Sequence, residues 1–380
     1  MLPRIPSIYR GILTLVGITL LLFMLLMQGN RPDTVSLRRL EIQNEVVGSA
    51  KIREEFGMEK STANIRTTLR TIKETVRYQN TDTRNIVNPH NFSYLKNPVN
   101  ICSEKDIYMI TYIHTSPKNF HKRQTIRSTW GDKRLLEQYK TKIVFVMGRV
   151  EDTKVMNKLD LENAHYGDIV QEDFLDSYKN LTYKGIAALK WISNYCNNTV
   201  FTLKTDDDIL VNIFKLVKHL KEIVEFQLGH KNLILCNQWL RMAVLRDKNS
   251  KWYIPKEDFT PDYFPPYCSG SAFVLSTDMT SRMYNASLYE KFFWVDDYYI
   301  TGMLPSHIKV KQKRLNEAYI LNGRVVYDKL VNDTKNQLMF FHVPKLNTIF
   351  SMWRLIKQRL QMHIQEEFTW SPVVSPSTVV

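Results

Sequence analysis

The chain has 380 residues, 44% of them hydrophobic and 12% aromatic, so it can bury a sizeable core and is not an intrinsically disordered protein. Its 52 Lys and Arg against 38 Asp and Glu give a formal net charge of +14, which favours an anionic partner. Because neither a long basic run nor a zinc-finger spacing accompanies this charge, a nucleic-acid-binding protein is disfavoured.

The N-terminus contains an uncharged segment, GILTLVGITLLLFMLLMQGN. It is long enough to cross a bilayer as a helix of about 20 residues. Its length and the absence of a small-residue cleavage site favour an uncleaved signal anchor over a cleaved signal peptide. We therefore expect four regions: a cytoplasmic tail (1–10), a transmembrane anchor (11–29), a lumenal stem (30–98) and a folded domain (99–380).

Sequons and cysteines beyond this segment support a lumenal body. The N-glycosylation tripeptides begin at Asn91, Asn180, Asn197, Asn285 and Asn332. In an oxidising lumen the four cysteines allow two disulfides with three possible connectivities, or they are buried free thiols. These cysteines are Cys102, Cys196, Cys236 and Cys268.

From residue 101 onward, strand-like apolar runs alternate with segments of helical spacing. Strands are expected within 106–115, 140–148, 168–174, 199–206 and 232–240, and helices within 116–131, 153–167, 181–196 and 213–226. This alternation predicts an α/β domain with βαβ units and a mostly parallel central sheet. Ligands of such sheets bind beyond the carboxyl ends of the strands.

The stretch FTLKTDDDILVN places three aspartates at one of these strand ends. Asp206 and Asp208, one residue apart, can face the same side and share a hard cation, with Asp207 pointing elsewhere. The alternative is an acidic turn that caps the following helix. No glycine-rich phosphate loop is present, so cations would have to hold any phosphate. Arg123 and Arg127 share a helix face and are candidates, unless that face is merely solvated.

Five segments in this order resemble the β-1,3-galactosyltransferase family (glycosyltransferase family 31). They are HKRQTIRSTWG, EDFLDSYKNLTYKGIAALKWISNYC, FTLKTDDDILVN, SKWYIPKEDFTPDYFPPYCSGSAFVLS and FFWVDDYYITGML. The resemblance covers about residues 101–342. It implies a GT-A-type (Rossmann-like) fold, a UDP-sugar donor, most simply UDP-galactose, and Mn²⁺. It further implies a single-pass type II Golgi membrane enzyme whose partners are the donor and a glycan acceptor on a glycoprotein or glycolipid.

The resemblance also assigns roles to residues. Asp297, the second acid of VDDYY, would be the base that takes the acceptor proton, although Asp296, Tyr298 and Thr301 replace the family's Glu, Val and Gly. Asp208 would be the principal metal ligand and Asp206 would lie near ribose and metal. The remaining assignments are a metal-shell role for His342, and donor contacts for Arg123, Arg127, Asp176, Lys204 and Gly270.

Several of these residues have structural explanations as well. His342 follows an apolar run, Asp176 precedes a helix that it could cap, and Gly270 could serve a tight turn. Two further functions also stay open at this point. One is transfer of N-acetylglucosamine from UDP-N-acetylglucosamine, and the other is an inactive Golgi binding protein or chaperone.

Overall fold

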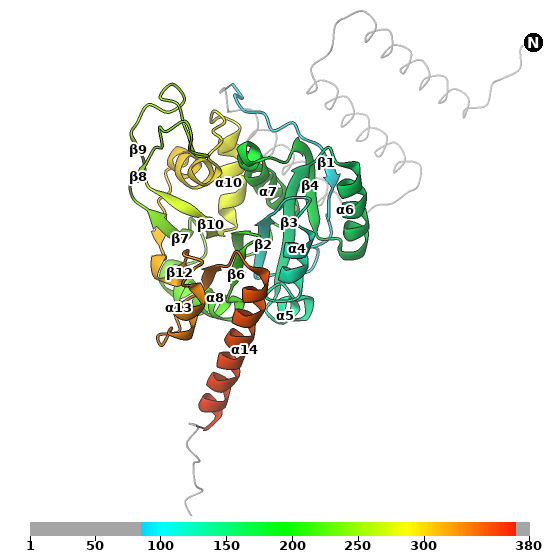
Figure 1. The fold of residues 1–380 in the computed structure, drawn as a ribbon, viewed down its shortest axis with the longest axis vertical. Helices are drawn as coiled ribbons and strands as arrows, with labels where there is room; N and C mark the ends of the chain where they lie inside the picture. The colour runs from blue at the N-terminus through cyan, green and yellow to red at the C-terminus, as the bar shows by residue number, and fades with distance from the viewer. Residues whose placement is uncertain (1–84, 370–380) are drawn as a thin grey trace, which may run out of the picture. The chain divides into compact units, whose positions relative to one another are not determined.

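The structure of the protein is a computed structural model that describes residues 85–369 (Figure 1). The predicted tail, membrane anchor and most of the predicted stem lie outside these residues. In the described part, no helix combines the length and the apolar character that a membrane span requires.

The strands form one large sheet and two small ones. The large sheet has the order β1-β4-β3-β2-β5-β10-β7-β11, a second sheet has the order β12-β13-β6, and β8 pairs with β9. The bounds are β1 Tyr94–Lys96, β2 Met109–His114, β3 Thr141–Arg149, β4 Ile169–Leu175, β5 Phe201–Asp206, β6 Ile209–Val211, β7 Ile234–Trp239, β8 Met242–Ala243, β9 Tyr263–Phe264, β10 Tyr267–Ser276, β11 Lys313–Arg314, β12 Tyr319–Ile320 and β13 Phe340–His342.

Four central strands, β4, β3, β2 and β5, are parallel, as the alternating pattern predicts. The whole sheet is mixed, however, and the prediction of a mostly parallel sheet holds only for this centre. Strand β10 runs antiparallel to both of its neighbours, β5 and β7, and β1 runs antiparallel to β4. As a result, the start of β10 lies at the same edge as the carboxyl ends of β2 and β5.

Helices cover both faces of the large sheet (Figure 1). Their bounds are α4 Phe120–Arg127, α5 Lys133–Gln138, α6 Thr153–Tyr166, α7 Leu181–Tyr195, α8 Ile213–His219, α9 Glu225–Leu228, α10 Asp278–Ser287, α11 Asp296–Tyr298, α12 Leu304–His307, α13 Val326–Val331 and α14 Leu346–Thr369. Helices α4, α6, α8 and α14 pack on one face, and α7, α10 and α12 on the other.

Two cores follow from the alternation of side chains along the strands. In β2, Met109 and Ile113 enter the core under α4 and α8, whereas Ile110 and Tyr112 enter the core under α7. Every residue of β2 is buried, which is typical of a central parallel strand covered on both faces. His114 therefore lies on the α7 side of the sheet.

The folded unit begins earlier than the predicted boundary between residues 98 and 99. Strand β1 pairs with β4, and the buried His90 contacts Glu172 of β4 at 2.5 Å, so this part of the predicted stem belongs to the folded body. The cysteines form two disulfides, Cys102–Cys196 and Cys236–Cys268, which selects one of the three connectivities. The second disulfide joins the neighbouring strands β7 and β10 close to the site described below.

Candidate active site

Asp206 ends β5 at the carboxyl edge of the parallel strands. Its Oδ1 lies 2.6 Å from Nζ of Lys204, and its side chain is 41% exposed while that of Lys204 is 2% exposed. The two residues share a face because they are two positions apart in a strand. The next helix, α8, is capped by Asn212, whose Oδ1 accepts a hydrogen bond from the backbone N–H of Lys215. The triplet is therefore not the cap of that helix.

The other two aspartates of the triplet have different surroundings. Asp207 is buried and accepts hydrogen bonds of 2.7 Å from Thr115, Asn119 and Lys122, so its carboxylate is held by groups of the protein. Asp208 is 30% exposed, and its Oδ2 lies 3.4 Å from the same Lys122 ammonium. Burial opposes the charge of Lys122, but its bonds to Asp207 and Asp208 raise its pKa, so it remains a cation beside the triplet.

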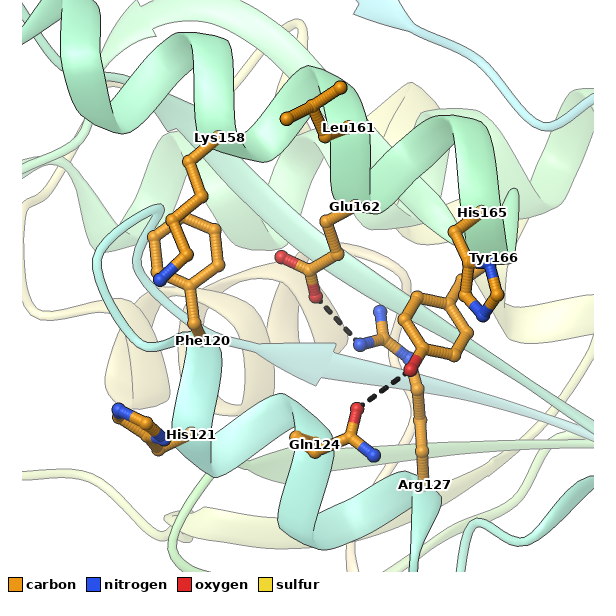
Figure 2. Close-up of a pocket in the computed structure, with 9 residues that line it drawn as sticks. All are labelled: Phe120, His121, Gln124, Arg127, Lys158, Leu161, Glu162, His165 and Tyr166. Atoms are coloured by element: carbon orange, nitrogen blue, oxygen red, sulfur yellow. Dashed lines mark hydrogen bonds and ion pairs between the residues drawn. The ribbon is translucent and has the colours of Figure 1, made fainter.

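Arg123 and Arg127 do not reach the triplet. Arg123 is fully buried and donates to Glu162 at 2.6 and 2.8 Å, and Arg127 donates to Glu162 at 2.6 Å and to Asp168 at 2.7 and 2.8 Å. Figure 2 shows Arg127 and Glu162 in a groove between α4 and α6, and no triplet residue lines this groove. The predicted donor role of both arginines is therefore not supported, because acids of other elements already neutralise them.

The carboxylate of Asp176 also interacts with other groups of the protein. Its Oδ2 accepts a hydrogen bond of 2.8 Å from the backbone N–H of Gly148, and Lys184 lies 3.0 Å from it. Lys184 in turn donates to the carbonyl oxygen of Thr115 at 2.6 Å. Asp176 therefore ties the ends of β3 and β2 to α7, and neither the predicted donor contact nor the alternative helix cap describes what its carboxylate does.

A second acidic group consists of Asp296 and Asp297. The first residues of β10 lie between this group and the aspartate triplet. Gly270 in β10 lies against Asp297, since a Cβ added at Gly270 would approach the Cβ of Asp297 to 2.9 Å. Nζ of Lys204, which contacts Asp206, also donates a hydrogen bond to the carbonyl oxygen of Gly270, so this ammonium lies between Asp206 and the glycine against which Asp297 packs. The absence of a side chain at Gly270 thus allows Asp297 to approach the backbone of β10 closely. The tight turn considered from the sequence is not formed, because Gly270 lies within a strand.

Thr301, which stands where the family has Gly, helps to fix this acid. Its hydroxyl accepts from the backbone N–H of Cys268 at 2.9 Å and donates to the carbonyl oxygen of Asp297 at 2.5 Å. Thr301 therefore ties α11 to β10.

The electrostatics of the cluster separate its members. Burial, followed by repulsion from Asp296, raises the pKa of Asp297 from 3.8 to about 7. Burial also raises the pKa of Asp206 to about 6, against the attraction of Lys204. The pKa of Lys204 is itself raised because the charges of Asp206 and Asp296 outweigh the effect of burial. Of these carboxyl groups, Asp297 therefore has its pKa raised to about 7, close to the pH at which a general base is most effective.

Asp208 and His342 are the two groups best placed to hold a divalent cation. Nε2 of His342 lies 3.9 Å from Oδ2 of Asp208, while its Nδ1 lies 3.1 Å from the carbonyl oxygen of Leu321, which orients the ring. Strand β13 brings His342 there by pairing with β6. Within residues 85–369, no group of three or more potential ligands gathers around one point. A divalent cation held by Asp208 and His342 alone would keep its other positions for phosphate or water.

Sequence reasoning missed His114, which ends β2 in register with Asp206. The imidazole is buried, its Nδ1 lies 3.8 Å from Oδ2 of Asp296, and its Nε2 has no hydrogen-bond partner among the described residues. Burial, followed by the charges of Lys204 and Lys184, lowers its pKa well below the usual value, so the ring is neutral. A polar residue at the carboxyl end of the strand next to β5 is the signal that would have found it.

Comparisons with known proteins bear on the family of the chain. The family model described as Galactosyltransferase matches residues 121–316, more than half of the chain. Beta-1,3-galactosyltransferase 1 of Homo sapiens and that of Mus musculus are each 32% identical over 214 residues, which are 56% of this chain and 65% of the relative. Beta-1,3-galactosyltransferase 5 of Homo sapiens is 28% identical over 224 residues, 59% of this chain and 71% of the relative.

Among solved structures, a glycosyltransferase involved in glycosylation of the major capsid of PBCV-1 matches with a TM-score of 0.38 and 9% identity. The match covers 65% of this chain and 99% of that one.

Proposed function

Because the chain belongs to the galactosyltransferase family, as its sequence motifs indicated, we propose that it transfers galactose from UDP-galactose to a glycan hydroxyl with inversion, forming a β-1,3 linkage. The chain spans 65% of the length of the first curated relatives that it matches, so this activity is an inference for the whole protein. The observation that carries the proposal is the pair of acidic groups joined by Lys204, one near the surface and one poised as a base.

In the proposed reaction, Asp297 accepts the proton of the acceptor hydroxyl. The hydroxyl oxygen forms a bond to the anomeric carbon of galactose while the bond from that carbon to the diphosphate breaks. UDP leaves with the bonding electrons, and the proton stays on Asp297. Asp297 is suited to this role because its pKa of about 7 combines a sufficient ionised fraction with a useful basicity. Gly270 and Thr301 hold it in position.

Asp208 and His342 would hold a divalent cation, for which we propose Mn²⁺. When bound, the cation supplies a Lewis acid that stabilises charge on the diphosphate. Asp206 adds a half-buried carboxylate at the same edge, and Lys204 keeps it oriented at 2.6 Å. Lys122 supplies a further positive charge beside Asp208, in the place that the sequence assigned to the two arginines.

We also propose that the enzyme works as a type II protein in the Golgi lumen. The two disulfides support an oxidising compartment, since such bonds are rare in the cytosol.

The test uses the full-length chain, purified in detergent, with a panel of UDP-sugars, an array of glycan acceptors and Mn²⁺. We expect transfer from UDP-galactose that requires the cation, and a loss of at least about a hundredfold in kcat for Asp297→Asn. The exposed Asp328 of α13 offers a matched control, because Asp328→Asn removes a carboxylate remote from the site. Turnover with none of the donors, or an Asp297→Asn variant as active as the parent, would refute the proposal.

A further inference from the structure

Three aromatic side chains, two exposed and one half-buried, lie within the electrostatic influence of Asp296 and Asp297 or close to them in sequence. We call Tyr178, Trp252 and Trp294 the aromatic platform. Nε1 of Trp252 donates a hydrogen bond of 2.7 Å to the Tyr178 hydroxyl, and the rings of Tyr178 and Trp294 are 6.3 Å apart. Tyr178 is 46% exposed and Trp252 is 47% exposed, although large aromatic rings are usually covered. The platform therefore presents apolar ring surface to solvent at a place where the chemistry needs a substrate.

The three rings come from separate elements that converge on the base. Trp294 precedes Asp297 by three residues, Tyr178 follows β4, and Trp252 belongs to the segment between β8 and β9. Burial raises the pKa of the Tyr178 hydroxyl, the hydrogen bond from Trp252 opposes this rise, and the charges of Asp296 and Asp297 add to it. Tyr178 thus lies within the electrostatic reach of the acids and keeps its proton, which it can donate to a sugar oxygen.

Two lysines lie on the platform. Nζ of Lys179 is 3.1 Å from the ring centre of Trp294, and Nζ of Lys251 is 4.2 Å from that of Trp252. Both lysines are exposed, and neither forms an ion pair with a carboxylate in the described part of the chain. Asp258 is the acid whose charge influences Lys179. Two cations thus stand over aromatic faces without an anionic partner in contact.

An ammonium group over an exposed ring is weakly held, whereas a charge-assisted hydrogen bond to an anion is stronger. A ligand that offers an anion would therefore draw the flexible lysine stems off the rings and uncover the faces for stacking. The CH-lined face of a pyranose ring fits such surfaces, and its hydroxyls fit the Tyr178 proton. A sugar that carries a negative charge would both pair with the lysines and stack on the aromatic rings.

We propose that the aromatic platform is the acceptor subsite and that Lys179 and Lys251 select an acceptor sugar bearing an anionic group, a sulfate or a uronate carboxylate. The inference rests on the proposed transferase activity and adds the acceptor class to it. It also gives the basic balance of the chain a local role.

The experiment compares two matched pairs of acceptors with UDP-galactose and Mn²⁺. The first pair is methyl β-N-acetylglucosaminide and its 6-sulfate, and the second is methyl β-glucoside and methyl β-glucuronide. Product is measured by mass spectrometry, and binding is measured separately by quenching of indole fluorescence. We expect the charged member of at least one pair to show a KM about tenfold lower than its neutral partner. The pair that responds identifies the anion as sulfate or carboxylate.

The variants Lys179→Gln and Lys251→Gln should each raise KM for the charged acceptor about three- to tenfold, and by a larger factor than KM of the neutral one. Trp252→Phe should keep binding, whereas Trp252→Ala should weaken binding of both members of a pair. Lys133→Gln is the control, because Lys133 is a 90% exposed lysine on α5.

Two kinds of result separate the inference from the proposed function. If UDP-galactose is neither hydrolysed nor transferred under any condition, the proposed function fails. If transfer occurs but charged and neutral acceptors behave alike, or if the lysine variants keep the preference, the inference alone is overturned. It is also overturned if none of the four glycosides quenches the indole fluorescence in the millimolar range, or if Trp252→Ala binds all of them like the parent.

Discussion

Removing the charge of Asp296 should shift the pH at which the neighbouring base becomes active. The rise of the Asp297 pKa from 3.8 to about 7 corresponds to about 4 kcal/mol in favour of its protonated form. Burial is the largest cause and repulsion by Asp296 the next. In Asp296→Asn the burial of Asp297 remains and the repulsion is lost. We therefore expect the pKa of Asp297 to fall by about one unit, which is a tenfold change in its protonation equilibrium and a smaller part of the total rise.

The sign follows from the role of the base. Asp297 must be ionised to accept a proton, so activity rises with pH through its pKa, and a lower pKa moves this acid limb to lower pH. The assay is the pH dependence of kcat/KM, each profile normalised to its own plateau so that a general loss of rate does not matter. The limb should move from about pH 7 to about pH 6. A limb that stays in place in Asp296→Asn, or moves upward, would show that another group controls the profile, and Asp328→Asn should leave it unchanged.

Three further predictions concern other parts of the site. Gly270→Ala should lower kcat about a hundredfold in stopped-flow turnover, because the added Cβ displaces Asp297, and an unchanged kcat would contradict the close approach. Asp208→Asn should weaken Mn²⁺ binding at least tenfold by electron paramagnetic resonance, and a chelator should abolish parent activity; equal affinity would remove Asp208 from the ligand set. Replacing both Cys236 and Cys268 by Ser should lower the free energy of unfolding by about 3 to 4 kcal/mol in denaturant titrations, and no change would show that the bridge does not constrain the unfolded chain.

The central strands and their helices could be predicted because local patterns specify them. The buried run of β2 and the helical spacing that became α6 and α7 each lie within about 15 residues of sequence. The place of β10 could not be predicted in this way. Its place beside β5 depends on pairing between residues more than 60 positions apart, for which a single sequence carries no periodic signal.

The site shows the same division between local and distant information. The position of Asp207 within the triplet predicts an orientation away from Asp206 and Asp208, but not its partners: Asp207 bonds Thr115 and Asn119 and shares Lys122 with Asp208. The spacing of Arg123 and Arg127 correctly predicted that they share a helix face. The spacing does not show which residue of another element the two side chains contact. Their shared partner, Glu162, belongs to α6. Only the packing of α4 against α6 shows that an ion pair with Glu162 neutralises the arginine charges. Lys122, one residue away, points to the triplet instead.

The sequence suggested that the donor end and the base end of the site are separate, with about ninety residues between Asp206 and Asp297. The structure joins them through Lys204, which contacts Asp206 and the carbonyl oxygen of Gly270 and whose charge lowers the pKa of Asp297 against the effect of burial. A change at one end must therefore alter the proton affinity at the other. Effects of substituting Asp206 and Asp297 should be non-additive, because groups that share one buried cation lose the same interaction only once. The two acidic groups thus act as one electrostatic unit, and the fold of β10 between them is what makes them so.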